Sequence, residues 1–367
     1  MGDQLKIGIL GTRGIPNRYG GFEQCAEYLA FGLTQKGHDV WVYNAHNHEY
    51  NEGNWKGVHI IYCNDPEYKL GTFGQFIYDY NCIKDARKRN FDILLHLGYT
   101  SNSIWRRIWP RGCRNIVNMD GLEWKRSKYS KYVQRFLKSA EKWAATNADV
   151  LIADSIGIQQ YLKDVYNKPS IYIPYGADIF DAPNPNILEK YTLLPFNFYL
   201  LIARIEPENN IETIIKGVIN ARQDKPLIII GKTNNTYGKY LNEKYASFEQ
   251  IQFLGGIYDV PVINNLRYYS LLYFHGHSVG GTNPSLLEAM GCSALIAAHN
   301  NTFNKSILDG DAFYFSSAED IVDIINEVGS KNIYQNKLNN NLKKILTSYN
   351  WENIVSKYEQ VFLNEVK

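Results

Sequence analysis

The chain has 367 residues, which suits about two domains of ordinary size, each with its own hydrophobic core. Its apolar fraction of 45% and charged fraction of 21% are typical of a globular protein and exclude a disordered chain. The formal net charge of +2 argues against a general nucleic-acid binder. The charge is unevenly distributed, because residues 105–143 alone contain eleven Lys and Arg against three Asp and Glu.

Cysteine usage and hydropathy indicate the compartment. The five cysteines are scattered and never spaced as CxxC, which argues against a disulfide framework or a structural zinc site. No apolar run approaches the ~18–20 residues that span a bilayer. The sequence passes from Met1 through a polar turn directly into a strand pattern, so we expect no signal peptide. These features predict a cytoplasmic protein that contacts a membrane, if at all, from its surface.

Strand and helix patterns alternate along the first half of the chain. The apolar run at residues 5–10 predicts a buried strand, and residues 22–36 follow with the spacing of an amphipathic helix. Further strands are expected at residues 40–43, 59–63, 93–97, 116–118, 150–153 and 170–173.

The alternation then begins again, with expected strands at residues 198–203, 227–230, 251–254, 271–274, 294–297 and 312–315. This order predicts an α/β fold of two Rossmann-like domains that face each other across a cleft. We assign residues 1–176 to an N-terminal acceptor-binding domain and residues 177–350 to a C-terminal nucleotide-binding domain. Residues 351–367 are expected to form a helix able to pack back on the N-terminal domain.

The first strand leads into a loop rich in glycine, at residues 11–21. Gly20 and Gly21 allow the backbone to approach an anion at the start of the following helix, and Arg13 and Arg18 would add positive charge. The alternative is an ordinary tight turn of an α/β protein. The glycines at positions 8, 11 and 14 do not form GxGxxG, which argues against a dinucleotide site.

A second glycine turn lies at residues 275–290. Gly281, Thr282 and Asn283 precede a helix that is expected to start at Pro284, and its free N–H groups suit a diphosphate. Glu288, one turn further along, could accept hydrogen bonds from a ribose diol. The alternative for Glu288 is a solvated carboxylate that stabilises the helix N-terminus.

Four segments together resemble a known family. Residues 281–290 resemble the signature of retaining GT-B glycosyltransferases of family four, and residues 173–178 resemble its interdomain linker. Residues 203–210 resemble its phosphate-binding segment, and residues 13–23 are similar to a bacterial rhamnosyltransferase-like branch. The resemblance implies that Gly281, Thr282 and Asn283 bind the diphosphate of a nucleotide sugar and that Glu288 binds its ribose.

The same resemblance implies that Arg204 neutralises the leaving phosphate, whereas the alternative is a surface ion pair with Glu206 or Glu208. The sequence departs from the family at two positions. Asn209 stands where the family has a second phosphate cation, and Gly280 stands where it has a sugar-binding Glu. Residues 301–304 are candidates to replace the sugar contact, and Arg13 or Arg18 to replace the cation.

Asp120 follows the strand at residues 116–118, where related enzymes place a polar residue near the reacting carbon. It could orient the acceptor hydroxyl or accept its proton. The alternative is a helix capping box, because Glu123 follows three residues later. His96 ends another strand and could share this role, although a buried structural histidine is the plainer interpretation. Asp309-Gly310-Asp311 has a DxD pattern, but it lies in an expected turn, and we predict no metal site.

The basic stretch suggests where the acceptor resides. Residues 105–111 mix tryptophan with arginine, as interfacial anchors do, and residues 129–143 form an apolar helical stripe with lysines and arginines largely off it. The alternative is a solvated basic face. The functional hypothesis is that residues 105–143 dock on an anionic membrane that carries a polyprenyl-diphosphate-linked acceptor.

These observations predict a retaining, metal-independent hexosyltransferase without a cofactor, acting in cell-envelope polysaccharide synthesis. The expected donor is dTDP-L-rhamnose, with a UDP-hexose as the alternative. A nucleotide-sugar epimerase and a non-catalytic nucleotide-sugar-binding protein are the other functions considered.

Overall fold

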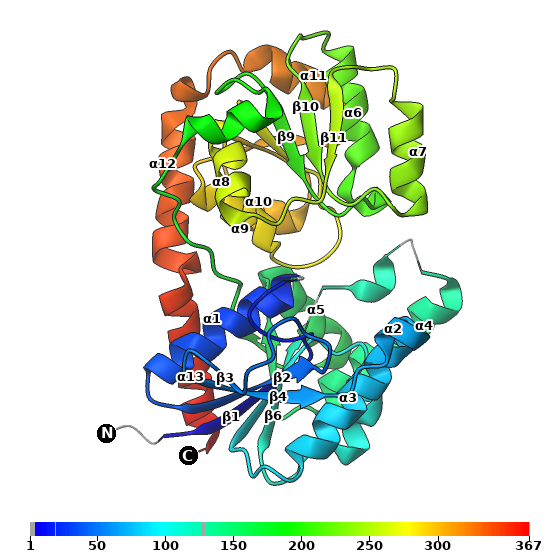
Figure 1. The fold of residues 1–367 in the computed structure, drawn as a ribbon, viewed down its shortest axis with the longest axis vertical. Helices are drawn as coiled ribbons and strands as arrows, with labels where there is room; N and C mark the ends of the chain where they lie inside the picture. Colours follow the sequence, from blue (N-terminus) through cyan, green and yellow to red (C-terminus); the bar gives the residue numbers. More distant parts are fainter. Residues whose placement is uncertain (1–3, 19, 120, 127–128, 367) are drawn as a thin grey trace. The chain divides into compact units, whose positions relative to one another are not determined.

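The computed structural model describes residues 4–18, 20–119, 121–126 and 129–366. The chain forms two compact units (Figure 1). One unit comprises Met1–Tyr175 together with Trp351–Lys367, and the other comprises Gly176–Asn350. Among the described residues, no helix combines the length and the hydropathy that a bilayer crossing requires.

The N-terminal unit is built on an eight-stranded sheet in the order β3-β4-β2-β1-β5-β6-β7-β8. Every neighbouring pair is parallel except β3 and β4, which form an antiparallel hairpin at one edge. The strands are β1 (Lys6–Leu10), β2 (Asp39–Ala45), β3 (Asn54–Trp55), β4 (Val58–Cys63), β5 (Ile93–Leu97), β6 (Arg114–Met119), β7 (Val150–Ala153) and β8 (Ile171–Tyr172).

Helices cover both faces of this sheet, as parallel strands with crossover connections require (Figure 1). All five residues of β5 are buried, because the central strands have protein on either side. The helices are α1 (Gly21–Gln35), α2 (Glu67–Leu70), α3 (Thr72–Ala86), α4 (Lys131–Asn147), α5 (Ile156–Tyr166), the 3-10 turns η1 (Ser103–Ile108) and η2 (Glu123–Lys125), and α13 (Trp351–Val366).

Helix α13 is distant in sequence from the rest of its unit and packs on α1. The Trp351 ring stacks on Tyr28 with 4.3 Å between the ring centroids. Further along α13, the hydroxyl of Tyr358 accepts a hydrogen bond from Asn118 Nδ2 at 2.7 Å. Asn118 lies on β6, so α13 is tied both to a helix and to the central sheet.

The C-terminal unit contains a fully parallel six-stranded sheet in the order β11-β10-β9-β12-β13-β14. In chain order this is 3-2-1-4-5-6, the doubly wound order of a Rossmann-like sheet. The strands are β9 (Tyr199–Ile202), β10 (Leu227–Ile230), β11 (Ile251–Gly255), β12 (Leu272–His275), β13 (Ile296–His299) and β14 (Phe313–Phe315). The remaining elements are η3 (Pro185–Tyr191), η4 (Pro207–Asn209), α6 (Ile211–Asn220), α7 (Thr236–Lys244), α8 (Val260–Tyr269), α9 (Pro284–Gly291), α10 (Thr302–Leu308), α11 (Ala318–Glu327), η5 (Lys331–Tyr334), α12 (Gln335–Lys344) and the π-helical turn η6 (Ile345–Tyr349).

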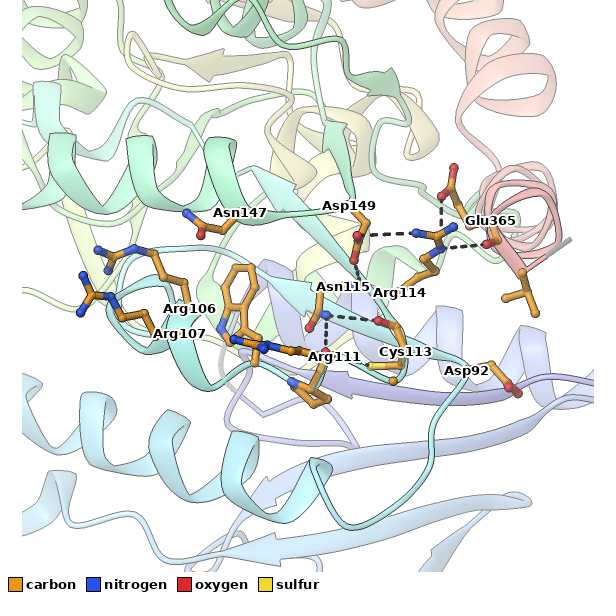
Figure 2. A pocket seen from close by; sticks show the side chains of 14 residues that line it. Asp92, Arg106, Arg107, Arg111, Cys113, Arg114, Asn115, Asn147, Asp149 and Glu365 are labelled. Atoms are coloured by element: carbon orange, nitrogen blue, oxygen red, sulfur yellow. Dashed lines mark hydrogen bonds and ion pairs between the residues drawn. The ribbon is translucent and has the colours of Figure 1, made fainter.

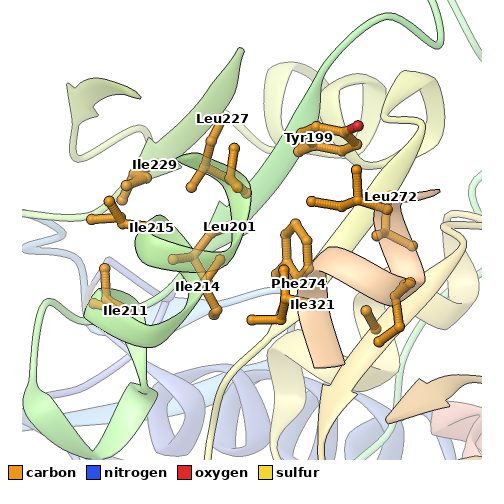
Figure 3. Packing of buried hydrophobic residues seen from close by; sticks show 14 of the residues in the cluster. Tyr199, Leu201, Ile211, Ile214, Ile215, Leu227, Ile229, Leu272, Phe274 and Ile321 are labelled. Carbon is orange, nitrogen blue, oxygen red and sulfur yellow. The ribbon is translucent and has the colours of Figure 1, made fainter. Parts of the chain in front are cut away.

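The core of this unit lies between one face of the sheet and helices α6 and α11 (Figure 3). Phe274 on β12 and Ile214 and Ile215 on α6 are fully buried. Helix α6 meets α11 at Gly217, where a Cβ atom would come within 2.5 Å of Ile321. The apolar faces predicted from helical spacing therefore meet the apolar strands, and the sheet edge with the carboxyl ends of the strands remains for loops.

One buried cation in this unit has a measurable consequence. Lys331 is 5% exposed, donates a hydrogen bond to the carbonyl of Tyr268, and lies about 5.5 Å from the ring of Phe196. Burial lowers its pKa to about 7, which Cys292 offsets only in part. In the unfolded chain a lysine keeps a pKa of about 10.4.

We therefore expect the free energy of unfolding to rise with pH between about 7 and 10, because the unfolded state then binds the extra proton. The contribution of Lys331 is at most about 1.4 kcal/mol per pH unit. Urea unfolding of the parent and of Lys331→Met at pH 7 and pH 9 measures it. The parent should gain more stability than the variant over this interval, and equal gains would contradict the prediction.

Candidate functional site

The candidate donor site lies in the C-terminal unit, at the carboxyl ends of β9 and β12. These strands are neighbours in the sheet. After β9 the chain continues to β10, toward one edge of the sheet, whereas after β12 it continues to β13, toward the other edge. Such a topological switch point is where open parallel sheets bind ligands. The loop after β9 contains Arg204, and the loop after β12 leads to α9 and Glu288.

The two loops are joined by hydrogen bonds. Asn210 Nδ2 donates to the carbonyl of Gly276 at 2.7 Å, and the hydroxyl of Ser278 donates to the carbonyl of Glu208 at 2.7 Å. A Cβ atom at position 276 would lie 1.9 Å from the carbonyl oxygen of Asn209, so this approach requires glycine. The loops thus form one structure with fixed geometry.

Arg204 is exposed at the end of β9, and within the described part of the chain no carboxylate contacts its guanidinium. The alternative ion pair with Glu206 or Glu208 is therefore not formed. Asn209, which replaces the family's cation, is buried and donates from Nδ2 to the carbonyl of Arg204 at 2.7 Å. Its Oδ1 lies 3.1 Å from Nδ1 of His277, which places that imidazole beside the Arg204 loop.

The hydrogen bonds of Asn209 fix the tautomer of His277. Because Nδ2 donates to a carbonyl, the atom facing the ring is Oδ1, which can only accept. His277 therefore carries a hydrogen on Nδ1. His277 was not among the residues predicted from sequence, and only its position three residues before Gly280 pointed to it.

Helix α9 begins as the sequence predicted. Asn283 is its N-cap and accepts a hydrogen bond from the backbone N–H of Ser285 at 2.9 Å, and Pro284 occupies the first turn. Gly280 has a φ of 119°, which favours glycine over the glutamate found in the related family. Gly281 and the buried Thr282 complete the turn before the helix.

Glu288 has a partner that the sequence did not reveal. Arg267, on α8, is buried and donates from Nη2 to Glu288 Oε2 at 2.6 Å and to Ser285 Oγ at 3.0 Å. The hydroxyls of Ser285 and Tyr273 lie 3.0 Å apart. Burial alone would lower the pKa of Arg267, but the charge of Glu288 reverses the shift and raises it. Glu288 is therefore not a fully solvated carboxylate, because one of its oxygens is bonded to the buried guanidinium of Arg267.

Among residues 301–304, the amide side chains of Asn301 and Asn304 are engaged within the unit. Asn301 caps α10 and donates from Nδ2 to the carbonyl of His277 at 2.9 Å. Asn304 donates from Nδ2 to the same carbonyl at 3.1 Å and to that of His299 at 2.9 Å. Both amides hold the backbone of His277 in place.

In the N-terminal unit, the loop after β1 places its arginines in ion pairs. Arg13 makes a bidentate contact with Glu67, at 2.8 and 3.1 Å, and Arg18 lies 3.6 Å from Glu49 on the exposed surface. Gly20 is the N-cap of α1, and Gly21 is its first residue, so the helix starts without a side-chain cap. An anion that approached this loop would compete with Glu67 for Arg13.

The structure assigns His96 a structural position. It is buried, its Nε2 lies 3.2 Å from Asn115 Oδ1, and its ring packs on Trp109 with 4.4 Å between the ring centroids. Burial lowers the pKa of His96 to about 4, and the contact with Asn115 opposes this shift only in part. The imidazole is therefore neutral at physiological pH.

Asp120 lies outside the described residues, and the segment that follows it is fixed by a buried carboxylate. Glu141 on α4 accepts hydrogen bonds from Tyr161 and Tyr166, each at 2.6 Å, and from Trp124 Nε1 at 3.1 Å. Trp124 lies in η2, four residues after Asp120. Glu141 was not among the residues predicted from sequence, because these partners come from two other elements, η2 and α5.

In the DxD sequence, the side chain of Asp311 is engaged by a lysine. Asp311 forms an ion pair with Lys344 at 2.8 Å, which outweighs the effect of burial and lowers the pKa of that carboxyl. Asp309 ends α10 with a φ of 51°. Among the described residues, no group of His, Cys, Asp and Glu has the arrangement to bind a metal ion.

The basic stretch is divided between the two edges of the N-terminal sheet. A pocket of about 780 Å³ at the amino ends of β5, β6 and β7 contains four arginines (Figure 2). Arg114 is the one nearest to carboxylates, with Asp149 at 3.7 Å and Glu365 at 3.9 Å. Arg106 and Arg107 lie on the other side of the pocket.

The two tryptophans of residues 105–111 are not available as membrane anchors. Trp109 is 6% exposed, and Trp105 donates to the carbonyl of Phe76 at 2.8 Å and packs on Tyr80. Arg107 and Arg111 are the exposed residues of this segment, whereas Arg106 is partly buried over the ring of Trp143. The cationic face of α4 is exposed at Lys131, Arg135 and Lys142.

Two family models match the chain. Residues 4–178 match a domain of unknown function (DUF1972), and residues 186–345 match glycosyl transferases group 1. Residues 186–345 are therefore a glycosyltransferase group 1 domain, and this domain contains Arg204, His277 and Glu288. No curated protein matches the chain.

Solved structures share the fold over the full length. Sucrose-phosphate synthase from Thermosynechococcus elongatus has a TM-score of 0.83 and 15% identity, covering 98% of this chain and 99% of its own. HepE from Anabaena, solved with UDP and glucose, has a TM-score of 0.75 and 16% identity, covering 98% of this chain and 100% of its own. A glycosyltransferase from Rickettsia africae has a TM-score of 0.72 and 12% identity, covering 100% of this chain and 99% of its own. The fold is therefore α/β of the GT-B type, with two Rossmann-like halves.

Proposed function

We propose that the chain transfers a sugar from a nucleotide sugar to a glycan or lipid-linked acceptor, with retention and without a bound metal. The observation that carries the proposal is the arrangement at the switch point of the glycosyltransferase group 1 domain. The two connected loops there carry Arg204 and His277 and lead to the N-terminus of α9, and Glu288 lies one turn into that helix. We assign donor binding to Gly176–Asn350 and acceptor binding to Met1–Tyr175.

Each group has a role that follows from its chemistry. Transfer of the sugar leaves a nucleoside diphosphate with added negative charge, which the Arg204 guanidinium can stabilise through two hydrogen bonds. His277, whose Nδ1 is bonded to Asn209, is a further candidate to contact the same diphosphate. The free N–H groups of α9 add a dipole, and the carboxylate of Glu288, held by Arg267, is suited to a ribose diol. Asp120 is our candidate for the group that accepts the acceptor proton.

The donor we favour is dTDP-L-rhamnose, because residues 13–23 are similar to the rhamnosyltransferase-like branch. A UDP-hexose is the second candidate, supported by the UDP and glucose bound to HepE. Neither a cofactor nor a metal ion is needed for the chemistry of these groups.

Nucleotide-induced thermal stabilisation tests the donor site. UDP, dTDP and their sugars should raise the melting temperature of the parent, and the preferred base should give the larger rise. In Glu288→Ala the rise, measured against that variant's own unliganded value, should fall by most of its size, because the ribose contact is lost. Glu319→Ala, an acidic residue in the first turn of another helix of the unit, is the matched control and should respond like the parent.

If Glu288→Ala is stabilised by nucleotides as strongly as the parent, the donor site is placed wrongly. Product analysis then separates the remaining functions. A transferase releases nucleoside diphosphate and a glycosylated acceptor, an epimerase alters the sugar without an acceptor, and a binding protein releases no nucleotide.

We further propose that the acceptor is carried by an anionic membrane, within cell-envelope polysaccharide synthesis, and that residues 105–143 contribute to the contact from the cytoplasmic side. The exposed cations of α4, Lys131, Arg135 and Lys142, support this. Each cation near such a surface contributes about 1 kcal/mol. Failure of the full chain to bind anionic vesicles at low salt would contradict it.

A further inference from the structure

We propose that the N-terminal unit inserts an apolar ridge into an anionic lipid surface, at the sheet edge opposite the arginine pocket. The ridge consists of residues 68–73, at α2 and the start of α3, and residues 131–133, at the start of α4. This inference rests on the proposed membrane-borne acceptor and adds residues 68–73, which lie outside the basic stretch, to the contact.

The ridge exposes large apolar side chains that a water-soluble surface seldom gathers together. Tyr68 is 64% exposed, Leu70 49%, Phe73 65%, Tyr132 81% and Val133 40%. Single exposed apolar residues are normal, whereas a contiguous group marks an interaction site. All six residues from Tyr68 to Phe73 are exposed, so this segment is not covered by any described part of the chain.

Ring contacts show that the two parts of the ridge lie close together. Phe76 on α3 packs on Phe136 on α4 with 5.6 Å between the ring centroids. Phe73 and Tyr132 precede these rings by three and four residues, which is one helical turn. Each therefore lies on the same side of its helix as the ring that makes the contact, one turn closer to the helix start.

The topology places the ridge at the carboxyl edge of the sheet. Helix α2 follows β4 after three residues, and α3 follows directly, so both begin where β4 ends. Helix α4 ends three residues before β7 begins, so its C-terminus lies at the amino edge and its first turn at the opposite edge. The carboxyl edge is where Rossmann-like sheets bind their substrates, so a membrane at the ridge would bring an acceptor to that edge.

The charges of the ridge favour an anionic partner. Lys69 and Lys131 are exposed within it, and it contains no Asp or Glu. The nearest carboxylate in sequence, Glu67, is bound by Arg13 at 2.8 Å. A second copy of the chain is a poorer partner, because a two-fold contact would bring the same lysines together. Aromatic residues flanked by lysines suit the boundary between headgroups and acyl chains.

Vesicle co-flotation of the full chain tests this inference. The vesicles contain phosphatidylcholine either alone or mixed with phosphatidylglycerol. We expect the parent to bind only the mixed vesicles, and Phe73→Ser/Tyr132→Ser to bind them at least about tenfold more weakly. Tyr258→Ser/Val260→Ser removes two apolar residues, each 62% exposed, from the other unit and should bind like the parent.

Four outcomes would overturn the inference. In the first, the parent does not bind vesicles, and in the second the ridge variant binds them as well as the parent does. In the third, the ridge substitutions change the oligomeric state of the protein and not its vesicle binding. In the fourth, Arg107→Gln/Arg111→Gln loses vesicle binding and the ridge variant keeps it. Thermal stabilisation by nucleotides should be the same in the ridge variant as in the parent, which also shows that the variant is folded. If the parent binds vesicles but no nucleotide, the proposed function fails and the ridge stands.

Discussion

Replacing Arg204 with alanine should lower the rate of sugar transfer at saturating donor by about 10²–10³-fold, the effect of removing one fixed donor from a charged transition state. The reason is that the guanidinium is exposed, lies at the end of β9, and contacts no carboxylate among the residues described. Release of nucleoside diphosphate in the presence of acceptor measures the rate. Stability should change little, because no internal ion pair is lost.

Two further variants make this result specific. Arg204→Lys keeps the charge but cannot form two parallel hydrogen bonds, so it should recover only part of the rate. Arg222→Ala removes an exposed arginine of the same unit that lies outside the site, and should be as active as the parent. If Arg204→Ala keeps a rate within threefold of the parent, Arg204 does not stabilise the leaving group.

Glu288→Ala should lower the free energy of unfolding by about 3–5 kcal/mol, in addition to its effect on nucleotide binding. The substitution leaves the guanidinium of Arg267, whose side chain is 4% exposed, without its carboxylate. A cation buried in this way is costly, and Ser285 supplies only a neutral partner for it. Urea unfolding at neutral pH measures the loss.

A double variant separates the structural role of Glu288 from its role in binding. Arg267→Met/Glu288→Met removes both charges and should regain most of the lost stability, because a buried ion pair can be replaced by apolar side chains. It should still fail to be stabilised by nucleotides, because the carboxylate is absent. Nucleotide binding by this double variant would show that Glu288 serves only to neutralise Arg267.

The fold was predictable because the strands are short, apolar and central. Three strands were predicted with the bounds that the structure shows, at residues 93–97, 150–153 and 227–230. Each is covered on both faces, so its sequence is a continuous apolar run whose ends are easy to locate. The two-residue strand β3 was missed, because a hairpin of that length at a sheet edge leaves almost no pattern in the sequence.

The local backbone features of the candidate donor site could also be predicted from sequence. The turn before α9 and the N-cap Asn283 follow local rules. The buried partners were not accessible, because Arg267 and Glu141 acquire their roles from residues that are distant in the sequence. The same limit applies to Trp105 and Trp109, whose composition suggested an anchor, because only the structure shows that Trp109 is buried against His96 and that Trp105 donates to the carbonyl of Phe76.

Helix α13 has a consequence for the order in which the molecule is made. The ribosome produces the sheet of the N-terminal unit first, then the whole of Gly176–Asn350, and only afterwards the helix whose Trp351 and Tyr358 complete that first sheet's packing. During synthesis the face of α1 that receives α13 therefore stays open to water while an entire second unit emerges. The unit that starts to fold first is the one that finishes last.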